Sequence, residues 1–394
     1  MKKNITKKYK DLNLGCSSMK LTSNTNNHYW FRTCDMDDVD NIWKAGSKVV
    51  SFKKGYKFNF SNKEIIESKY SILGVSYGKP YERLLDGINE KNLVGGLLYY
   101  VEGTSINLLT INEKHPNKKY IEGMEVLTYF LATCASVNEV IDLAKKTIIT
   151  DIIHGEYIVK ATMHYTFLDN NGDSVVLEAN KNGEFDIYEK TIGVFTNSPG
   201  YQEHINNLSW FIANSLELQN GRTETNLKET SGPITEFFLD NVIIKGAKES
   251  KTYMRSNVFP GSYTSTDRFI RLATLKNLVN CGKIYTDEEM LIKGNELMSS
   301  VIVPKHKGYF YYNYLLEESK QKATYKDHSL SGKILYGGKD DYTQYIIMYN
   351  LKEKQIFIKS DKSLVYDCFS LDNIKEGLTI YEINNDIVKG IIYH

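Results

Sequence analysis

A cysteine directly after a glycine, Cys16, is the residue of this sequence best placed to do chemistry. If the peptide bond between Gly15 and Cys16 is cut, Cys16 carries both a thiol and a free α-amine. The amine has a reference pKa of about 7.7–8.0, well below the value of about 10.4 for a lysine, so it can exchange a proton near neutral pH. A nucleophile and its general base would then belong to one residue.

Residues 1–15 are predicted to be a short propeptide that is removed to expose Cys16. They carry five lysines in the first ten positions and lack the apolar run of roughly 7–15 residues that a signal peptide needs. A solvated, disordered tail is the alternative interpretation of such a segment. The propeptide is favoured because the segment stops abruptly at Gly15 and Cys16, and because residues 17–31 have the pattern of a hairpin with a polar turn at 23–27.

The composition indicates a globular protein without a dominant electrostatic partner. The chain has 394 residues, of which 41% are hydrophobic and 25% charged, enough for one large domain or two ordinary ones. A net charge of +1 argues against a nucleic acid or an anionic membrane, since both require a clustered basic surface. We therefore expect no nucleic acid and no membrane among the partners.

The cysteines and histidines predict neither a disulfide framework nor a metal site. The five cysteines are odd in number and widely spaced, and no Cys-x-x-Cys pair occurs. The eight histidines show no His-Glu-x-x-His spacing, so core or surface roles are expected for them. We expect no metal, no cofactor and a reducing, cytoplasmic location.

Strand-like and helix-like segments indicate an α+β layered architecture, because sheets are flanked by helices without strict βα alternation. Strands are expected at residues 48–52, 56–60, 70–75, 93–101, 157–168, 174–179, 184–189, 191–196, 342–349, 355–359 and 378–383. Helices are expected at 123–134, 137–146, 202–216, 267–280 and 287–301. Ser136 is the expected N-cap of the second helix, and residues 169–172 predict a hairpin turn.

A series of short motifs follows Cys16 in a fixed order. They are Cys16-Ser17-Ser18, Phe31-Arg32-Thr33-Cys34-Asp35, Asp86-Gly87-Ile88-Asn89-Glu90-Lys91, Leu98-Tyr99-Tyr100, Met163-His164-Tyr165-Thr166-Phe167, Thr196-Asn197-Ser198-Pro199-Gly200-Tyr201, and Pro260-Gly261 followed by Arg268-Phe269. Together they resemble the choloylglycine hydrolase family of N-terminal nucleophile (Ntn) hydrolases, which includes penicillin V acylases and conjugated bile salt hydrolases. The resemblance implies a four-layer αββα sandwich, formed by residues 16–394 as a single catalytic domain.

The resemblance makes Cys16 the nucleophile and places Arg32 and Asp35 beside it. An arginine near a thiol favours the reactive thiolate, and a carboxylate can orient an α-ammonium group. The plain alternative is an ordinary ion pair between two residues three positions apart. The cysteine nearby favours the catalytic interpretation.

Three further positions match family site residues. The side-chain amide of Asn197 and the backbone N–H of Tyr99 would donate to a developing oxyanion, and Arg268 would supply positive charge near Cys16 or the substrate. The plain alternatives are a turn-forming asparagine, a core aromatic and a helix-surface arginine. The resemblance to the family favours the roles in the site over these alternatives.

The implied activity is hydrolysis of a linear amide through a thioester on Cys16. Tyr99 favours the penicillin V acylase type, because penicillin V acylases resemble this chain in having tyrosine there, whereas many bile salt hydrolases have asparagine. A conjugated bile salt hydrolase is the alternative, and a catalytically silent relative that binds an acylated ligand or a partner protein is the third hypothesis. Acyl homoserine lactones are a further substrate class that only the resemblance suggests. The expected partner is a small-molecule amide, and a homo-oligomer stays open.

Two insertions and one substitution depart from the family pattern. The insertions lie near residues 219–256 and 305–339, and the first puts the usual tetramer contacts of the family in doubt. Surface placement is expected for both. Cys34 stands where methionine is common; it is interpreted as a packing substitution, although a second thiol near Cys16 could form an oxidised pair.

Overall fold

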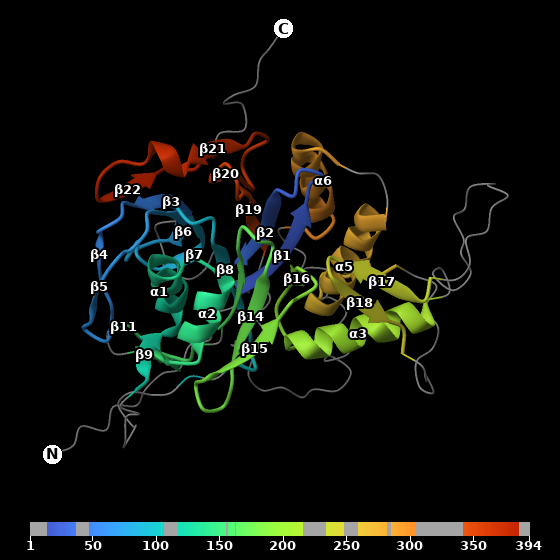
Figure 1. Ribbon diagram of the computed structural model, residues 1–394, viewed down its shortest axis with the longest axis horizontal. Helices are drawn as coiled ribbons and strands as arrows, with labels where there is room; N and C mark the ends of the chain where they lie inside the picture. Colours follow the sequence, from blue (N-terminus) through green and yellow to red (C-terminus); the bar gives the residue numbers. More distant parts are fainter. Residues whose placement is uncertain are drawn as a thin grey trace, which may run out of the picture.

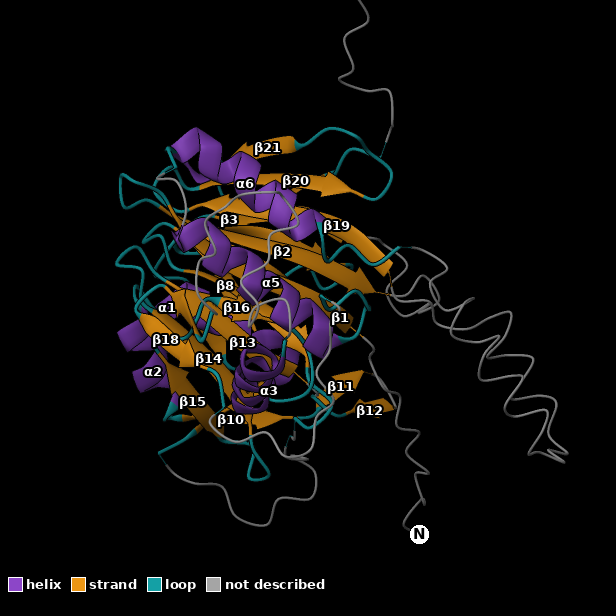
Figure 2. Cartoon of the chain, turned by 90° about the vertical axis from the view of Figure 1, so that its right-hand side faces the viewer, coloured by secondary structure: helices purple, strands orange, loops and turns teal. Residues whose placement is uncertain are grey.

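Two large antiparallel sheets lie face to face with helices on both outer sides (Figures 1 and 2). The computed structural model describes residues 14–36, 47–103, 105, 117–154, 157–161, 163–215, 234–247, 259–281, 285–304 and 342–385. The order of layers is helix, sheet, sheet, helix. The predicted α+β class and the αββα sandwich of Ntn hydrolases are therefore confirmed.

The first sheet carries Cys16, the predicted nucleophile. Its strands follow the order β16 (Val194–Phe195), β1 (Leu14–Thr22), β2 (His28–Met36), β19 (Tyr342–Asn350), β20 (Gln355–Ser360) and β21 (Asp367–Ser370). The β1–β2 hairpin confirms the one predicted from the sequence, and Asn26 takes a φ of 60° in its turn, a conformation that asparagine tolerates. Cys16 lies inside β1, directly opposite Cys34 on β2.

The second sheet covers the inner face of the first. Its order is β15 (Phe185–Glu189), β14 (Ser174–Ala179), β13 (Met163–Leu168), β8 (Val94–Tyr99), β7 (Leu84–Asn89), β6 (Ile72–Tyr77), β3 (Ser47–Phe52) and β22 (Leu378–Tyr381). The two central strands β7 and β8 are almost entirely buried, as expected for strands covered on both faces.

Helices cover the two outer faces. The second sheet is covered by α1 (Val126–Thr133), which follows the short η2 (Gly123–Glu125), and by α2 (Val137–Ala144). The first sheet is covered by α3 (Tyr201–Asn214), α5 (Ser265–Cys281) and α6 (Asp287–Ser299), which Figure 2 shows in front of the strands. The Ser136 side chain accepts from the Glu139 N–H, which confirms the predicted N-cap. No helix among the described residues combines the length and apolar character needed to span a bilayer.

Smaller elements complete the described chain. They are the strand pairs β4 (Lys57–Asn59) with β5 (Ile65–Glu67), β9 (Lys119–Glu122) with β10 (Thr147–Thr150), β11 (Ile152–His154) with β12 (Tyr157–Val159), and β17 (Glu236–Leu239) with β18 (Val242–Lys245), and the 3-10 helix η3 (Leu371–Asn373). The β17–β18 hairpin is the described part of the first predicted insertion. The second insertion, residues 305–339, and the predicted propeptide up to residue 13 lie outside the described residues.

Some predicted strands differ from the observed ones for local reasons. The run at 157–168 is divided into β12 and β13, because its first part pairs with β11 and its second with β8 and β14. The strand expected at 191–196 shrinks to β16, since Gly193 takes a φ of +63° just before it and turns the chain. Strand β7 was not predicted, because Asp86 and Gly87 interrupt its apolar pattern.

Alternation along β1 and β2 sorts the site residues onto two faces. Arg32 contacts the second sheet through the Leu85 and Leu97 carbonyl oxygens, so it points inward, and Cys34 two residues later shares that face. Phe31 points outward, where it packs against α6 at Gly294. Cys16 therefore projects into the space between the two sheets.

We predict that Gly294→Ala destabilises the fold by roughly 1–3 kcal/mol through overpacking. A methyl group there would lie 2.0 Å from Phe31 Cε1, and Phe31 is fully buried, so its ring has no room to retreat. The clash exceeds the gain of about 1 kcal/mol that alanine brings to a helix over glycine. Urea unfolding followed by circular dichroism measures the change.

Ile292→Ala is the matched control on the same helix. Ile292 is 62% exposed, so its truncation should shift stability by only about 0.5 kcal/mol. Equal losses for both variants would contradict the tight α6 packing.

Candidate active site

Both main-chain polar groups of Cys16 are held from the edge of β1 that faces away from β2. Its N–H donates to Asn197 Oδ1 at 2.8 Å, and its carbonyl oxygen accepts from Arg268 Nη1 at 2.7 Å. Asn197 follows β16, the strand on that edge, and Arg268 comes from α5. The position of Cys16 is therefore fixed by side chains that lie far away in sequence.

The thiol of Cys16 contacts Arg32, whose side chain is completely buried. Arg32 Nη2 lies 3.0 Å from Cys16 Sγ and also donates to the Leu97 carbonyl oxygen at 2.7 Å. Arg32 Nη1 donates to the Leu85 carbonyl oxygen at 2.5 Å. The guanidinium thus connects the β1–β2 hairpin with β7 and β8 of the facing sheet, in a fixed orientation.

Asp86 on β7 is the counter-ion of Arg32, and sequence reasoning gave it no role. Its carboxylate accepts from Arg32 Nη1 at 2.6 Å, from the Tyr345 hydroxyl at 2.7 Å and from the Tyr349 hydroxyl at 2.5 Å. Burial raises the pKa of Asp86, and the Arg32 charge with the two hydroxyl groups opposes that effect. An aspartate in an otherwise apolar strand was the signal that could have revealed this pair.

The surroundings of Cys16 give it a low thiol pKa. Burial acts to raise the pKa, but a hydrogen bond from Cys34 and the positive charge of Arg32 lower it more, and the balance is about 7. Burial and the hydrogen bond to Cys16 raise the pKa of Cys34 well above its usual range. Cys16 therefore titrates between thiol and thiolate near neutral pH, while Cys34 stays protonated.

Asp35 lies on the outer face of β2, away from Arg32. It accepts from Thr343 Oγ1 at 2.6 Å and forms an ion pair with Arg268 Nη1 at 3.4 Å. The alternative interpretation, an ion pair between Arg32 and Asp35, is wrong: residues three positions apart on a strand point to opposite faces, and each has another partner.

Arg268 is not the helix-surface arginine of the plain alternative, since it is only 4% exposed. Besides the Cys16 carbonyl, it donates to Ser17 Oγ at 2.5 Å and to Asn197 Oδ1 at 2.8 Å. Its charge is therefore directed at the main chain of the nucleophile and at Asn197.

Asn197 links Cys16 to the end of β8. Its Oδ1 accepts from Cys16 and Arg268, and its Nδ2 donates to the Tyr99 carbonyl oxygen at 3.0 Å. Tyr99 itself is half-buried at the edge of the core. The structure thus brings all six residues predicted for the site into one set of contacts: Cys16, Arg32, Asp35, Tyr99, Asn197 and Arg268.

His204 on α3 fixes the loop that carries Asn197. Burial lowers the pKa of His204 to about 4, so the ring is neutral at physiological pH and its Nε2 donates to the Asn197 carbonyl oxygen at 2.8 Å. The ring also stacks on Phe269, next to Arg268, with centroids 4.5 Å apart. The expected core role of this histidine is therefore positional: it connects α3, α5 and Asn197.

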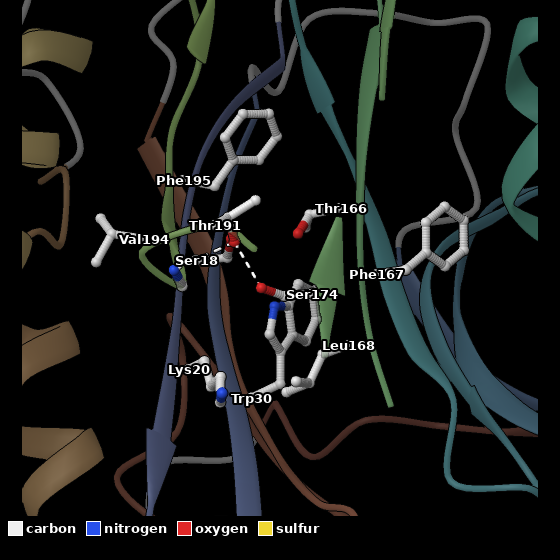
Figure 3. A pocket seen from close by; sticks show the side chains of 11 residues that line it. Ser18, Lys20, Trp30, Thr166, Phe167, Leu168, Ser174, Thr191, Val194 and Phe195 are labelled. Atoms are coloured by element: carbon white, nitrogen blue, oxygen red, sulfur yellow. Dashed lines mark hydrogen bonds between the residues drawn. The ribbon is translucent and has the colours of Figure 1, made fainter. Parts of the chain in front are cut away.

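The space between the sheets beyond Cys16 is nearly filled. Figure 3 shows a cavity lined by Ser18 and Trp30 of the first sheet and by Thr166 and Ser174 of the second. Its volume of about 10 Å³ has room for at most about one water molecule. This cavity is therefore too small to hold an acyl group.

Residues 16–312 match the model of the linear amide C–N hydrolases, choloylglycine hydrolase family. A bile salt hydrolase/transferase of Clostridium perfringens is 27% identical over 264 residues, which cover 66% of this chain and 72% of that protein. A conjugated bile acid hydrolase structure from the same species has a TM-score of 0.70 at 22% identity and covers 96% of this chain and 99% of its own. A penicillin V acylase structure from Agrobacterium tumefaciens has a TM-score of 0.60 at 18% identity, with 93% and 90% covered. These structures share the fold of this chain.

Cys16 is buried, so its alkylation by iodoacetamide requires the reagent to reach the space between the sheets; we predict that the alkylation rate increases with pH around a midpoint of about 7. The thiolate is the reactive form, and its fraction rises as the pH passes the thiol pKa. Peptide mapping by mass spectrometry, at a series of pH values, measures the rate at each cysteine separately.

Cys368 provides the reference in the same sample. The residue is exposed to solvent, and the partial burial of its thiol raises the thiol pKa. Its alkylation should need a higher pH than that of Cys16. Coincident profiles for the two cysteines would refute the activation of Cys16 by Arg32 and Cys34.

We also predict that Asp86→Asn costs about 3–5 kcal/mol of stability, because it leaves the Arg32 charge buried without a counter-ion. Tyr349→Phe, which removes one hydrogen bond to the same carboxylate, should cost only about 1 kcal/mol. Urea denaturation of both variants gives the comparison. Similar small losses would show that the ion pair is not essential to the fold.

Proposed function

Because the chain belongs to the choloylglycine hydrolase family and is thus a hydrolase acting on linear amides, we propose that Cys16 is its nucleophile and works as an N-terminal residue. The observation that carries this proposal is that Cys16 is held at two atoms. Its backbone N–H donates to Asn197 Oδ1, and its sulfur contacts Arg32 Nη2. The family match also begins at Cys16, which supports the removal of residues 1–15.

Cleavage before Cys16 would create an α-amine beside two oxygen acceptors. Gly15 pairs with Asp35 across the hairpin, and a Cβ on Gly15 would lie 3.3 Å from Asp35 Oδ2. Asn197 Oδ1 already accepts from the same nitrogen. The Asp35 carboxylate and the Asn197 oxygen would therefore orient the new amine, while its pKa of about 7.7–8.0 suits proton exchange with a thiol whose pKa is about 7.

In the proposed reaction the Cys16 thiolate attacks the amide carbonyl carbon. The α-amine, which has taken the thiol proton, gives it to the leaving amine, and a thioester remains on Cys16. Water then attacks the thioester and releases the acid. Arg32 keeps the sulfur anionic before attack, and its contacts to Leu85, Leu97 and Asp86 hold it in place.

We assign the stabilisation of the oxyanion in the tetrahedral intermediate to two donors, the side-chain amide of Asn197 and the backbone N–H of Tyr99. The contact between Asn197 Nδ2 and the Tyr99 carbonyl places these two residues next to each other, close to Cys16. Arg268 acts as a positioning residue, since it binds the Cys16 carbonyl and Asn197 Oδ1.

Tyr99 supports an acylase of the penicillin V type, which hydrolyses a phenoxyacetyl-like amide. The second candidate is a conjugated bile salt hydrolase, and the observation that favours it is the 27% identity with the Clostridium perfringens enzyme. Parallel assays on phenoxymethylpenicillin and on glycine- and taurine-conjugated bile salts distinguish the two. Turnover of neither class, by a protein with an intact N-terminal Cys16, would favour the silent ligand-binding relative.

We predict that the purified wild-type protein lacks residues 1–15 by intact mass, and that Cys16→Ala abolishes amide hydrolysis. Removal of the thiol eliminates the only proposed route to the thioester. Rates of amine release and intact masses of both proteins are the measurements.

Cys134→Ala is the matched control, since Cys134 is a buried free cysteine on the far side of the second sheet, beside α1. It should keep both processing and turnover. Hydrolysis by Cys16→Ala, or turnover by a wild type that retains residues 1–15, would contradict the proposal.

A further inference from the structure

We propose that Cys34 is a resolving cysteine for Cys16: after a peroxide has oxidised the nucleophile, the two residues form a reversible disulfide across the β1–β2 hairpin. This inference goes beyond amide hydrolysis. It is carried by the placement of a second buried thiol directly opposite the first, on the same face of the sheet.

The hydrogen-bond pattern around Cys16 identifies the kind of cross-strand pair. The N–H and carbonyl of Cys16 are bonded to Asn197 and Arg268, on the edge of β1 away from β2. Cys16 and Cys34 are therefore a non-hydrogen-bonded pair, in which the Cα atoms are about 4.5 Å apart and the side chains are closest. That separation falls within the range of about 4.4–6.8 Å that disulfides require.

Arg32 brings the two sulfur atoms to one cation. Its Nη2 lies 3.0 Å from Cys16 Sγ and 3.8 Å from Cys34 Sγ, and the thiol of Cys34 hydrogen-bonds to Cys16. Both sulfur atoms therefore lie beside the same guanidinium nitrogen.

The chemistry balances with a hydroperoxide as the oxidant. The Cys16 thiolate attacks one peroxide oxygen, the O–O bond breaks, and after protonation Cys16 carries a sulfenic acid while the other oxygen leaves as water or an alcohol. The Cys34 sulfur then attacks the Cys16 sulfur, the S–O bond breaks, and the Cys34 proton leaves with the hydroxyl as water. A dithiol reductant restores both thiols by exchange and becomes a disulfide itself.

Oxidation of Cys16 also prepares Cys34 to attack. Burial, the hydrogen bond to Cys16 and the charge of the Cys16 thiolate all raise the pKa of Cys34, while Arg32 lowers it. When Cys16 becomes a neutral sulfenic acid, the repulsion by its thiolate disappears and the Arg32 charge remains. Cys34 would then lose its proton more readily, at the moment when its thiolate is needed.

The test treats the purified wild-type protein with hydrogen peroxide, blocks the remaining thiols with N-ethylmaleimide and maps peptides without reduction. We expect a peptide cross-linked between Cys16 and Cys34, which disappears after treatment with dithiothreitol. Cys34→Ser should instead accumulate the sulfinic acid of Cys16, which dithiothreitol does not reverse. Cys134→Ser is the matched control and should give the wild-type cross-link.

A wild type that forms sulfinic acid at Cys16 without the cross-link overturns the proposal. A Cys34→Ser protein in which Cys16 is protected from sulfinic acid formation as well as in the wild type also overturns it. If Cys34→Ser does not fold, Cys34→Ala serves as the second variant, and the wild-type peptide map by itself still tests the proposal. Because the readout is peptide mass, it is independent of amide turnover and separates a failure of this proposal from a failure of the proposed function.

Discussion

The ion pair between Arg32 and Asp86 is the interaction on which the site depends. It joins the two sheets at the centre of the sandwich, where both side chains are completely buried. Burying two charges is expensive, and only good geometry with further hydrogen bonds offsets that cost. Here two tyrosine hydroxyls and two backbone carbonyls supply those bonds. The pair therefore fixes how the β1–β2 hairpin faces the second sheet, and it directs a positive charge at the Cys16 sulfur.

The hairpin of β1 and β2 divides the work of the site between its two faces. The inner face carries Cys16, Arg32 and Cys34, and it sets the ionisation of the sulfur. On the outer face and at the adjoining edge, Asp35 and Arg268 hold the main chain around Cys16 together with Asn197. Two opposite charges three residues apart can therefore serve different functions without neutralising each other, because a strand turns successive side chains to opposite sides.

Much of this arrangement could be predicted from the sequence. Alternating and apolar patterns revealed most strands and the five outer helices α1, α2, α3, α5 and α6, and the ordered motifs identified the six residues that the structure brings together. The partners of those residues could not be predicted, because these contacts depend on how strands and helices pack in three dimensions. Asp86 is one case, since a single polar residue obscured its strand. His204 is another: its spacing resembles that of any helical core residue, and only the three-dimensional contact with the Asn197 carbonyl reveals its role. The cross-strand register that places Cys34 opposite Cys16 likewise became evident only with the hairpin geometry.

Strand β1 begins at Leu14, two residues before Cys16. Leu14 and Gly15 both pair with β2 in the uncut chain. The contacts to Asn197, Arg32 and Arg268 therefore exist while Cys16 is still an internal residue. In this respect the chain differs from a zymogen that must rearrange to become active. Removal of the leading segment would add the charge of the new α-amine and open access to Cys16 at a site whose contacts have already formed. Maturation would therefore change the chemistry and the accessibility of the site, with little change of conformation. The free energy needed to assemble the site is then supplied by folding, before the first substrate arrives.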